Sequence, residues 1–127
     1  MDYYSIGEVA VLTGLSQHTL RWYERIGLMN YIERDHSGQR RFIDSDLRWL
    51  ELVGRLRSTG MAVADMVRYA ELVRLGDSTI PERLAMFEKT RAEALAKITE
   101  LRDAVAVLDR KIETYSTKVQ EQEGVKA

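Results

Sequence analysis

The chain has 127 residues, of which 45% are hydrophobic and 31% are charged, a balance typical of a folded protein in water. This length allows one domain, or one small domain with a helical extension. The absence of Cys excludes disulfides, thiolate metal sites and any thiol nucleophile or thiol sensor. No apolar run is long enough to cross a membrane, and the first residues do not resemble a signal peptide. We therefore expect a cytoplasmic protein.

The net charge of −1 conceals an uneven distribution of cations along the chain. The eight basic residues before residue 61 are all Arg, whereas every Lys lies at residue 89 or later. The planar guanidinium group of Arg binds phosphates and base edges through paired hydrogen bonds. A nucleic-acid partner would explain this bias, but a genome rich in G and C would produce it as well.

The first part of the chain has the pattern of a helix-turn-helix. Ser5 and the Glu three residues later predict a capping box that starts one helix, and Gly14 ends that helix. Ser16 starts a second predicted helix, which covers 17 to about 26 and points Leu20 inward. A Gly turn between two helices that an apolar residue seals together is what a helix-turn-helix needs.

A hairpin and two further helices are predicted next. Two β-leaning runs at 31–34 and 39–43 flank a polar turn with Gly, which indicates a wing. Asp44 or Ser45 is expected to cap a third helix, at roughly 46–58. A fourth helix is predicted from about Val63 to Leu75. The expected fold is mainly α, with a winged helix-turn-helix over 1–76.

One long helical pattern follows. Thr79 and Glu82 predict another capping box, with Pro81 in the first turn. An apolar stripe with alternating three- and four-residue spacing then continues to residue 119, and at about 1.5 Å per residue this helix would be roughly 60 Å long. The stripe consists of Leu84, Phe87, Arg91, Ala94, Ile98, Leu101, Val105, Leu108, Ile112, Tyr115 and Val119.

A stripe of this length predicts a coiled-coil homodimer over 77–119, because a four-helix domain cannot bury it. A long helix folded back on its own domain is the alternative. Arg91 interrupts the stripe, and a polar residue in such a seam often sets its register. The polar residues 120–127 predict a frayed tail. All the stripe residues named above except Arg91, Ala94 and Val119 are the expected dimerisation residues.

The sequence lacks the constellations of an enzyme. The glycines are scattered and form no phosphate-binding loop, and His18 and His36 stand alone without metal-ligand spacing. We therefore expect no catalytic activity, no cofactor and no metal site.

Several segments together resemble the MerR family of bacterial transcription regulators. They are 4–10, 20–28, 38–42, 46–47 and 56–61. The segment after Gly76, Asp-Ser-Thr-Ile-Pro-Glu-Arg, also resembles the short-tailed branch that responds to aldehydes and other reactive electrophiles.

The resemblance implies a dimer that binds a palindromic promoter site in the bacterial nucleoid. In such promoters the spacer between the two polymerase recognition elements is too long, and the dimer distorts the DNA so that RNA polymerase meets both elements. Carried over by position, the expected DNA-contacting residues are Ser16, Thr19, Arg21, Tyr23, Arg40, Arg41 and Arg57. Trp22 and Tyr23 project about 100° apart on a helix, so one should be buried, and we favour Tyr23 as the exposed DNA contact. An architectural or excisionase-like DNA-binding protein and a coiled-coil adaptor are the alternatives.

Two residues depart from the family pattern. Gln39 stands where the wing often has Tyr, and Gly54 stands where the electrophile-responsive relatives carry a sensing Cys. Gly54 indicates either close packing against the long helix or room for a small ligand. The second interpretation predicts a candidate effector pocket near Gly54, Tyr69 and Phe87, between the third and fourth helices and the partner's long helix, and any effector there would bind non-covalently.

Overall fold

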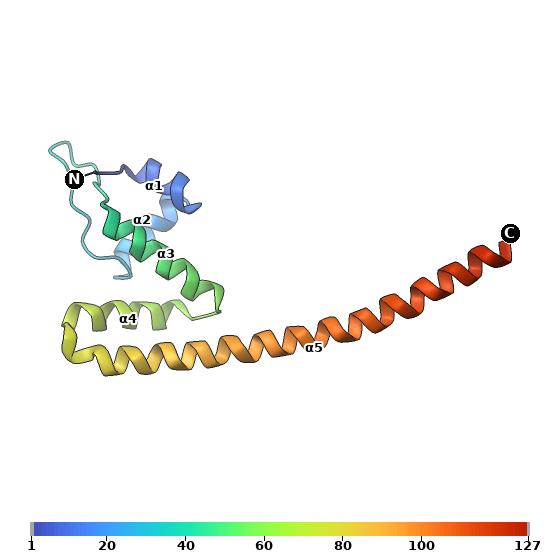
Figure 1. The fold of residues 1–127 in the computed structure, drawn as a ribbon. Helices are drawn as coiled ribbons and strands as arrows, with labels where there is room; N and C mark the ends of the chain where they lie inside the picture. The colour runs from blue at the N-terminus through green and yellow to red at the C-terminus, as the bar shows by residue number, and fades with distance from the viewer. Residues whose placement is uncertain (1, 127) are drawn as a thin grey trace. The chain divides into compact units, whose positions relative to one another are not determined.

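The structure is a computed structural model that describes residues 2–126 and is mainly helical (Figure 1). Its elements in chain order are α1 (Ile6–Thr13), α2 (Gln17–Arg25), α3 (Asp44–Ser58), α4 (Val63–Leu75), the short 3-10 helix η1 (Asp77–Thr79) and α5 (Ile80–Lys126). The chain divides into two compact units, Met1–Thr90 and Arg91–Ala127. We call the first unit the head, and the second, which holds the rest of α5, the tail helix.

The helices α1 and α2 form the expected helix-turn-helix. The Ser5 hydroxyl accepts a hydrogen bond from the Glu8 amide, and the Glu8 carboxylate accepts one from the Ser5 amide, which confirms the capping box. After α1 the chain turns at Gly14, whose φ of 73° is left-handed and favours Gly. Ser16 caps α2 by accepting a hydrogen bond from the Thr19 amide at 3.0 Å. Both predicted helix starts are therefore confirmed.

The core of the head lies where the first four helices meet. α1 packs against α2 and α3, and α3 packs against α4. Val9 from α1, Leu20 from α2, Leu50 from α3 and Met66 from α4 are buried there together with Phe42, which precedes α3. Full burial of such a side chain contributes roughly 1.5–3 kcal/mol, so this shared cluster holds the short helices in place.

The expected wing is present as a short antiparallel hairpin. Its two arms meet in an isolated bridge between Arg34 and Arg40. A second bridge, between Tyr4 and Phe42, ties the end of the hairpin to the residues just before α1, with both backbone hydrogen bonds at 2.8 Å. The wing is thereby anchored to the helix-turn-helix at its base.

The start of α3 differs from the prediction. Neither Asp44 nor Ser45 is the cap, because the helix already begins at Asp44, after Ile43. Asp46 explains the earlier start, since its Oδ2 reaches back and accepts a hydrogen bond from the Ile43 amide at 2.9 Å. Partial burial raises the pKa of the Asp46 carboxyl, although this backbone hydrogen bond opposes the rise. The next helix, α4, has the predicted bounds.

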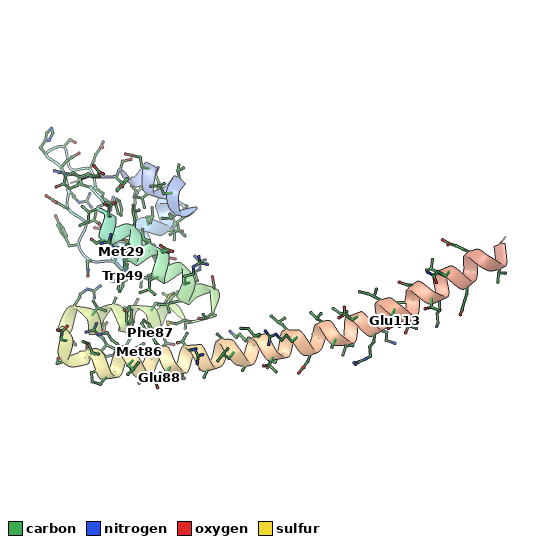
Figure 2. The ribbon with its side chains drawn as sticks, in the orientation of Figure 1. Met29, Trp49, Met86, Phe87, Glu88 and Glu113 are labelled. Carbon is green, nitrogen blue, oxygen red and sulfur yellow. The ribbon has the colours of Figure 1, made fainter. Side chains whose placement is uncertain are left out.

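Three aromatic rings join α3, α4 and the start of α5, and Figure 2 labels the outer two. The rings of Trp49 and Tyr69 stack with centroids 5.5 Å apart, and those of Tyr69 and Phe87 lie 4.8 Å apart. The indole N–H of Trp49 donates to the Leu28 carbonyl at 2.8 Å, which ties α3 to the segment after α2. Phe87, expected in the dimer seam, is therefore partly buried within its own head.

The start of α5 also differs from the prediction, because Thr79 and Glu82 do not cap each other. The Thr79 hydroxyl donates to the carbonyl groups of Leu72 and Gly76. The Glu82 carboxylate instead accepts a hydrogen bond from Arg68, on α4, at 3.3 Å. These bonds connect the first turn of α5 to α4. The capping-box pattern considers only residues three apart, so it cannot predict them.

The other end of α5 is longer than predicted. The helix continues to Lys126, past residue 120, where fraying is expected to begin, and Ala127 lies outside the described residues. Gln, Glu and Lys dominate this segment, and all three are good helix formers that lose little side-chain freedom. No helix within residues 2–126 is long and apolar enough to cross a membrane.

Candidate nucleic-acid interface

The exposed face of α2 is the first part of the interface. Leu20 and Tyr23 are buried in the core, and Trp22 is 38% exposed whereas Tyr23 is 2% exposed. The prediction that Tyr23 is the exposed member of this pair is therefore wrong. Adjacent helical side chains project about 100° apart, and packing against α3 selects which of them is buried. The residues exposed on α2 are Gln17, His18, Trp22 and Arg25.

Arg25 is a residue of this face that sequence reasoning leaves out. Its side chain is exposed, and among the described residues no carboxylate forms an ion pair with it. A helical wheel of α2 would have identified Arg25, because it lies five residues after the buried Leu20 and therefore about 140° around the helix from it. α2 is the second helix of the helix-turn-helix and therefore the expected recognition helix, so an unpaired Arg on its outer face is a candidate phosphate or base contact.

Ser16 and Thr19 engage each other at the start of α2. Besides capping the helix, the Ser16 hydroxyl donates to Thr19 Oγ1 at 2.9 Å. Ser16 is exposed and Thr19 is half-buried. The structure thus gives both residues a role in starting α2, and their contact with DNA stays a prediction.

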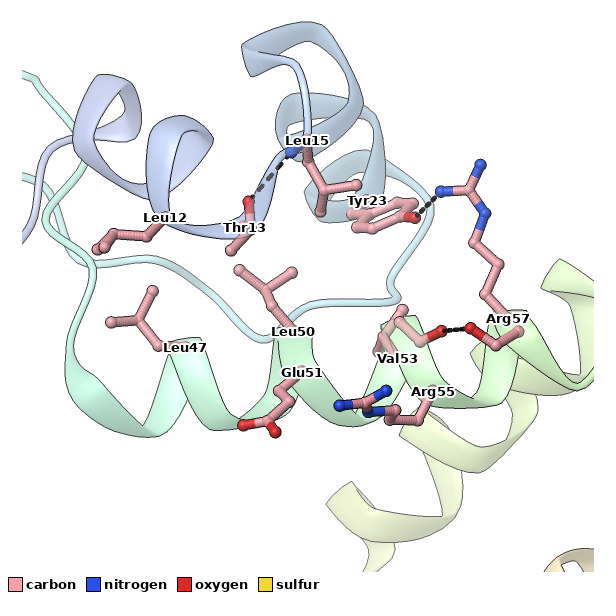
Figure 3. Close-up of a pocket in the computed structure, with 12 residues that line it drawn as sticks. Leu12, Thr13, Leu15, Tyr23, Leu47, Leu50, Glu51, Val53, Arg55 and Arg57 are labelled. Atoms are coloured by element: carbon pink, nitrogen blue, oxygen red, sulfur yellow. Dashed lines mark hydrogen bonds between the residues drawn. The ribbon is translucent and has the colours of Figure 1, made fainter.

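Arg57, in the last turn of α3, lies beside the hydroxyl of Tyr23. Its Nη1 donates to that hydroxyl at 3.3 Å, as Figure 3 shows. The buried ring of Tyr23 thereby presents its polar end to an exposed guanidinium group. The two expected contact residues are thus brought together by the fold.

The two expected arginines of the wing already have partners in the chain. Arg40 donates through Nε to Glu24 on α2, at 2.7 Å, and the two side chains are only 20% and 18% exposed. The guanidinium carbon of Arg41 lies 3.7 Å from the centre of the Tyr3 ring, a cation–π contact. Arg41 is half-buried, so neither residue projects freely from the wing.

A small hollow lies between α1, α2 and the wing. It has a volume of about 300 Å³, and its lining includes Arg21 from α2 with Arg34 and Arg40 from the wing. Ser5 and Ile6, at the start of α1, form part of its wall. Arg21 and Arg34 have no carboxylate partner among the described residues, so their guanidinium groups make this hollow suited to an anion.

The turn of the wing is organised by one carboxylate. Asp35 Oδ1 accepts hydrogen bonds from the Ser37 hydroxyl at 2.7 Å, the Ser37 amide at 2.9 Å and the Gln39 amide at 3.0 Å. These bonds lower the pKa of the Asp35 carboxyl from its ordinary value, with the Ser37 hydroxyl contributing most and the Gln39 amide next. The charged carboxylate therefore stabilises the turn.

A larger groove runs between α3 and the end of α1 (Figure 3). It has a volume of about 480 Å³ and is lined mostly by apolar side chains, including Leu12 and Leu47, with Gly54 on its α3 wall. A side-chain carbon added at Gly54 would meet no atom within 4 Å in this chain. Close packing at Gly54 is therefore not found in the head.

The three residues of the candidate effector pocket do not line one cavity of the single chain. Gly54 faces the groove beside α1, whereas the tilted rings of Tyr69 and Phe87 contact each other in the ring cluster on the other side of α3. Gly54 and Trp49 are five residues apart on α3, which separates them by about 140° around the helix. A pocket that a partner's long helix completes stays a prediction.

The tail helix, described by itself, carries the predicted apolar stripe on its surface. Ile98, Leu101, Val105, Leu108, Ile112, Tyr115 and Val119 are each between 43% and 66% exposed. In a single chain these side chains remain in contact with water. Within residues 2–126, no group of three or more His, Cys, Asp or Glu residues could hold a metal ion.

Comparison with known proteins gives a consistent result. Residues 4–72 match the family described as MerR HTH family regulatory protein. An uncharacterised HTH-type transcriptional regulator of Haemophilus influenzae is 40% identical over 112 residues, which cover 88% of this chain and 83% of that protein. The crystal structure of HiNmlR, a MerR family regulator lacking the sensor domain, bound to promoter DNA, matches with a TM-score of 0.86 and 39% identity, over 91% of this chain and 92% of that one. A MerR family transcriptional regulator from Bacillus thuringiensis matches with a TM-score of 0.79 and 30% identity, over 89% and 99%.

Proposed function

The chain belongs to the MerR family of helix-turn-helix regulators, and we propose that it acts as a homodimer that binds a palindromic promoter site and regulates transcription by distorting that DNA. One observation carries the proposal. The head presents arginines from α2, the wing and the end of α3, and the same chain carries an exposed apolar stripe suited to pairing. The likeness to HiNmlR, which was crystallised on promoter DNA, supports this role.

The stripe supports a homodimer on energetic grounds. Burying one Leu or Ile side chain contributes roughly 1.5–3 kcal/mol. Association costs roughly 4–15 kcal/mol in lost translational and rotational freedom. The seven stripe residues on each chain are 43–66% exposed when alone, so pairing buries roughly the remaining half of each side chain, a contribution comparable with that cost or larger. We assign DNA binding to 1–76 and dimerisation to 77–119, with Leu84 joining the seam and Phe87 serving the head.

A dimer would hold two recognition helices at a fixed separation. Such a pair matches a palindrome whose half-sites are a whole number of helical turns apart. If the DNA must bend or untwist to meet both helices, the energy of deformation becomes a switch, because it changes how RNA polymerase meets the promoter. RNA polymerase in a bacterial cytoplasm is the partner that this mechanism requires.

Any effector would bind without a thiol adduct, because the 127 residues contain no Cys. The groove beside Gly54 is the cavity that we assign to it, in place of the ring cluster. Its lining combines apolar side chains with charged ones such as Glu51 and Arg55, and the Tyr23 hydroxyl and Arg57 guanidinium lie at one end. Gly54→Leu would project into this groove. It should alter promoter activation more than DNA affinity, and unchanged transcription by a folded variant would remove the groove as an effector site.

The proposed function is tested with the DNA upstream of this protein's own gene and its neighbours. We expect the full chain to retard one such fragment specifically, with an affinity that falls steeply as salt rises because counterions compete for the phosphates. Transcription from that fragment should change when the protein is added. Binding that leaves transcription unchanged would favour an architectural role, and no binding at low salt would favour an adaptor with an inactive head.

A further inference from the structure

The ion pair between Glu24 and Arg40 joins the recognition helix to the wing. Its N–O distance is 2.7 Å, and about four-fifths of each side chain is buried. A pair in this position has lost most of its hydration. If Arg40 moved away to contact a phosphate, Glu24 would be left partly buried and unpaired next to DNA. Both the burial of an unpaired charge and the repulsion between this carboxylate and the phosphates are unfavourable.

Arg34 lies opposite Arg40 in the backbone β-bridge of the wing, but its side chain has a different environment. Its side chain is exposed, and its Nη1 donates to the Gly38 carbonyl at 3.0 Å, within the wing turn. Among the described residues no carboxylate pairs with it. A guanidinium group has several further N–H donors, so this bond leaves Arg34 able to grip a phosphate.

Arg21 brings a second guanidinium group to the same hollow from another element. It lies on α2 and donates to Gln17 Oε1 at 3.2 Å, again without a carboxylate partner. The hollow of about 300 Å³ therefore holds cations from both the recognition helix and the wing. A phosphate bound there would contact the two elements at once.

We propose that this hollow seats one phosphate of the DNA backbone, gripped by Arg34 and Arg21, and that Arg40 is a positioning residue that holds the wing against α2 through Glu24. The inference rests on the proposed function, and it names the side chains that meet the partner. It moves the phosphate contact of the wing from Arg40 to Arg34. The ion pair between Glu24 and Arg40 fixes the separation of the Arg21 and Arg34 guanidinium groups.

The test measures DNA affinity across salt concentrations for variants of the full chain. The probes are a duplex that the wild-type protein selects from a random-sequence pool, and a scrambled duplex of the same length and composition. Arg34→Ala should weaken binding to both duplexes about ten-fold. It should also lower the salt slope, which is the steepness with which the logarithm of the binding constant falls with the logarithm of salt concentration, by about one, as loss of a phosphate contact does. Arg110→Ala, which removes the same charge from the outer face of α5, is the matched control and should change neither quantity.

The role of Arg40 is tested by a charge swap. Arg40→Ala and Glu24→Gln should each reduce the preference for the selected duplex and leave the salt slope unchanged, because neither removes a phosphate contact. The double variant Glu24→Arg with Arg40→Glu restores the pair with reversed polarity, so it should recover most of that preference. Glu24→Gln retains the shape of the side chain, which keeps the test valid if Arg40→Ala fails to fold.

The outcomes separate this inference from the proposed function. A salt slope that falls by about one in Arg40→Ala, with no recovery in the swapped variant, would show that Arg40 itself contacts phosphate and would overturn its positioning role. An unchanged slope in Arg34→Ala would overturn the phosphate site. If the wild-type chain selects no duplex from the pool, the proposed function fails and this inference falls with it.

Discussion

Arg57 donates a hydrogen bond from Nη1 to the hydroxyl of Tyr23 at 3.3 Å, and this contact joins the last turn of α3 to the recognition helix. The ring of Tyr23 is buried in the core of the head, so its hydroxyl is held in place. A guanidinium group directed by a fixed hydroxyl loses less conformational freedom when it meets a phosphate. Tyr23 thus has two separable roles, one in packing and one in directing Arg57.

The two roles of Tyr23 predict different effects for two substitutions. Tyr23→Ala should lower the free energy of unfolding by about 3–5 kcal/mol, because it leaves a cavity in the core. Tyr23→Phe keeps the ring and should cost only about 0.5–1.5 kcal/mol. Chemical denaturation at a fixed protein concentration measures both. Equal losses for the two variants would contradict the separation.

Arg57 itself should behave as a phosphate contact. Arg57→Ala is expected to weaken binding to all DNA sequences and to lower the salt slope by about one. Gel retardation on a specific and a scrambled duplex across salt concentrations makes this measurement. A loss confined to one sequence would show base readout instead.

Leu101 and Leu108 test the dimer seam. Replacing both with Lys would place charges in a buried seam without partners, so the variant should be monomeric at micromolar concentration. Replacing Asp103 and Arg110 with Lys is the matched control, because these positions lie on the opposite face of α5 and are exposed. Analytical ultracentrifugation distinguishes the two. A dimer that survives the Leu substitutions would place the seam elsewhere.

Gly54 and Gly14 form a matched pair for testing backbone conformation. A side-chain carbon would meet nothing within 4 Å at either position, but Gly14 has a φ of 73° whereas Gly54 lies inside α3. Gly54→Ala should therefore raise the free energy of unfolding by about 0.5–1 kcal/mol. Gly14→Ala should lower it by about 1–2 kcal/mol. Thermal unfolding of both variants checks the signs, and a destabilised Gly54→Ala would indicate a neighbour from the second subunit.

The wing turn should depend on pH through Asp35. Because the hydrogen bonds from Ser37 and Gln39 lower the pKa of Asp35 below its ordinary value of 3.8, its stabilising effect is complete above that value. The effect should disappear as the pH falls through the lowered pKa. Amide NMR signals of Ser37 and Gln39 should titrate below pH 3.8, and Asp35→Asn should abolish this titration. A midpoint above the ordinary value would contradict the assignment.

Local signals explain which parts of the head could be predicted from the sequence. Ser5, Ser16 and Gly14 act on backbone groups within a few residues, so their types and spacing are sufficient. The start of α3 was harder to place, because Asp46 caps it from inside the helix. Thr79 similarly donates to a carbonyl seven residues away, which a capping pattern does not represent.

The side-chain arrangement depended on contacts between distant residues, and the sequence alone could not supply it. Which of Trp22 and Tyr23 is buried depends on α3, and the partner of Arg40 is sixteen residues away on another element. Residue type and position are enough to identify the Arg residues of the wing, but their partners in the fold decide their roles. A helical wheel of α3 separates Gly54 from the ring cluster, so the spacing of Gly54 and Trp49 alone indicates that they face different sides.

The two tryptophans differ in exposure, so their intrinsic fluorescence can report on the state of the protein. Trp22 is exposed on the outer face of α2, so its fluorescence should be quenched by a solute such as acrylamide. Trp49 is stacked on Tyr69 and donates its indole N–H to Leu28, which shields it from such a quencher. DNA that covers α2 would then protect Trp22 alone, whereas unfolding of the head would expose both indoles. A single quenching titration can therefore distinguish binding from denaturation without an added dye.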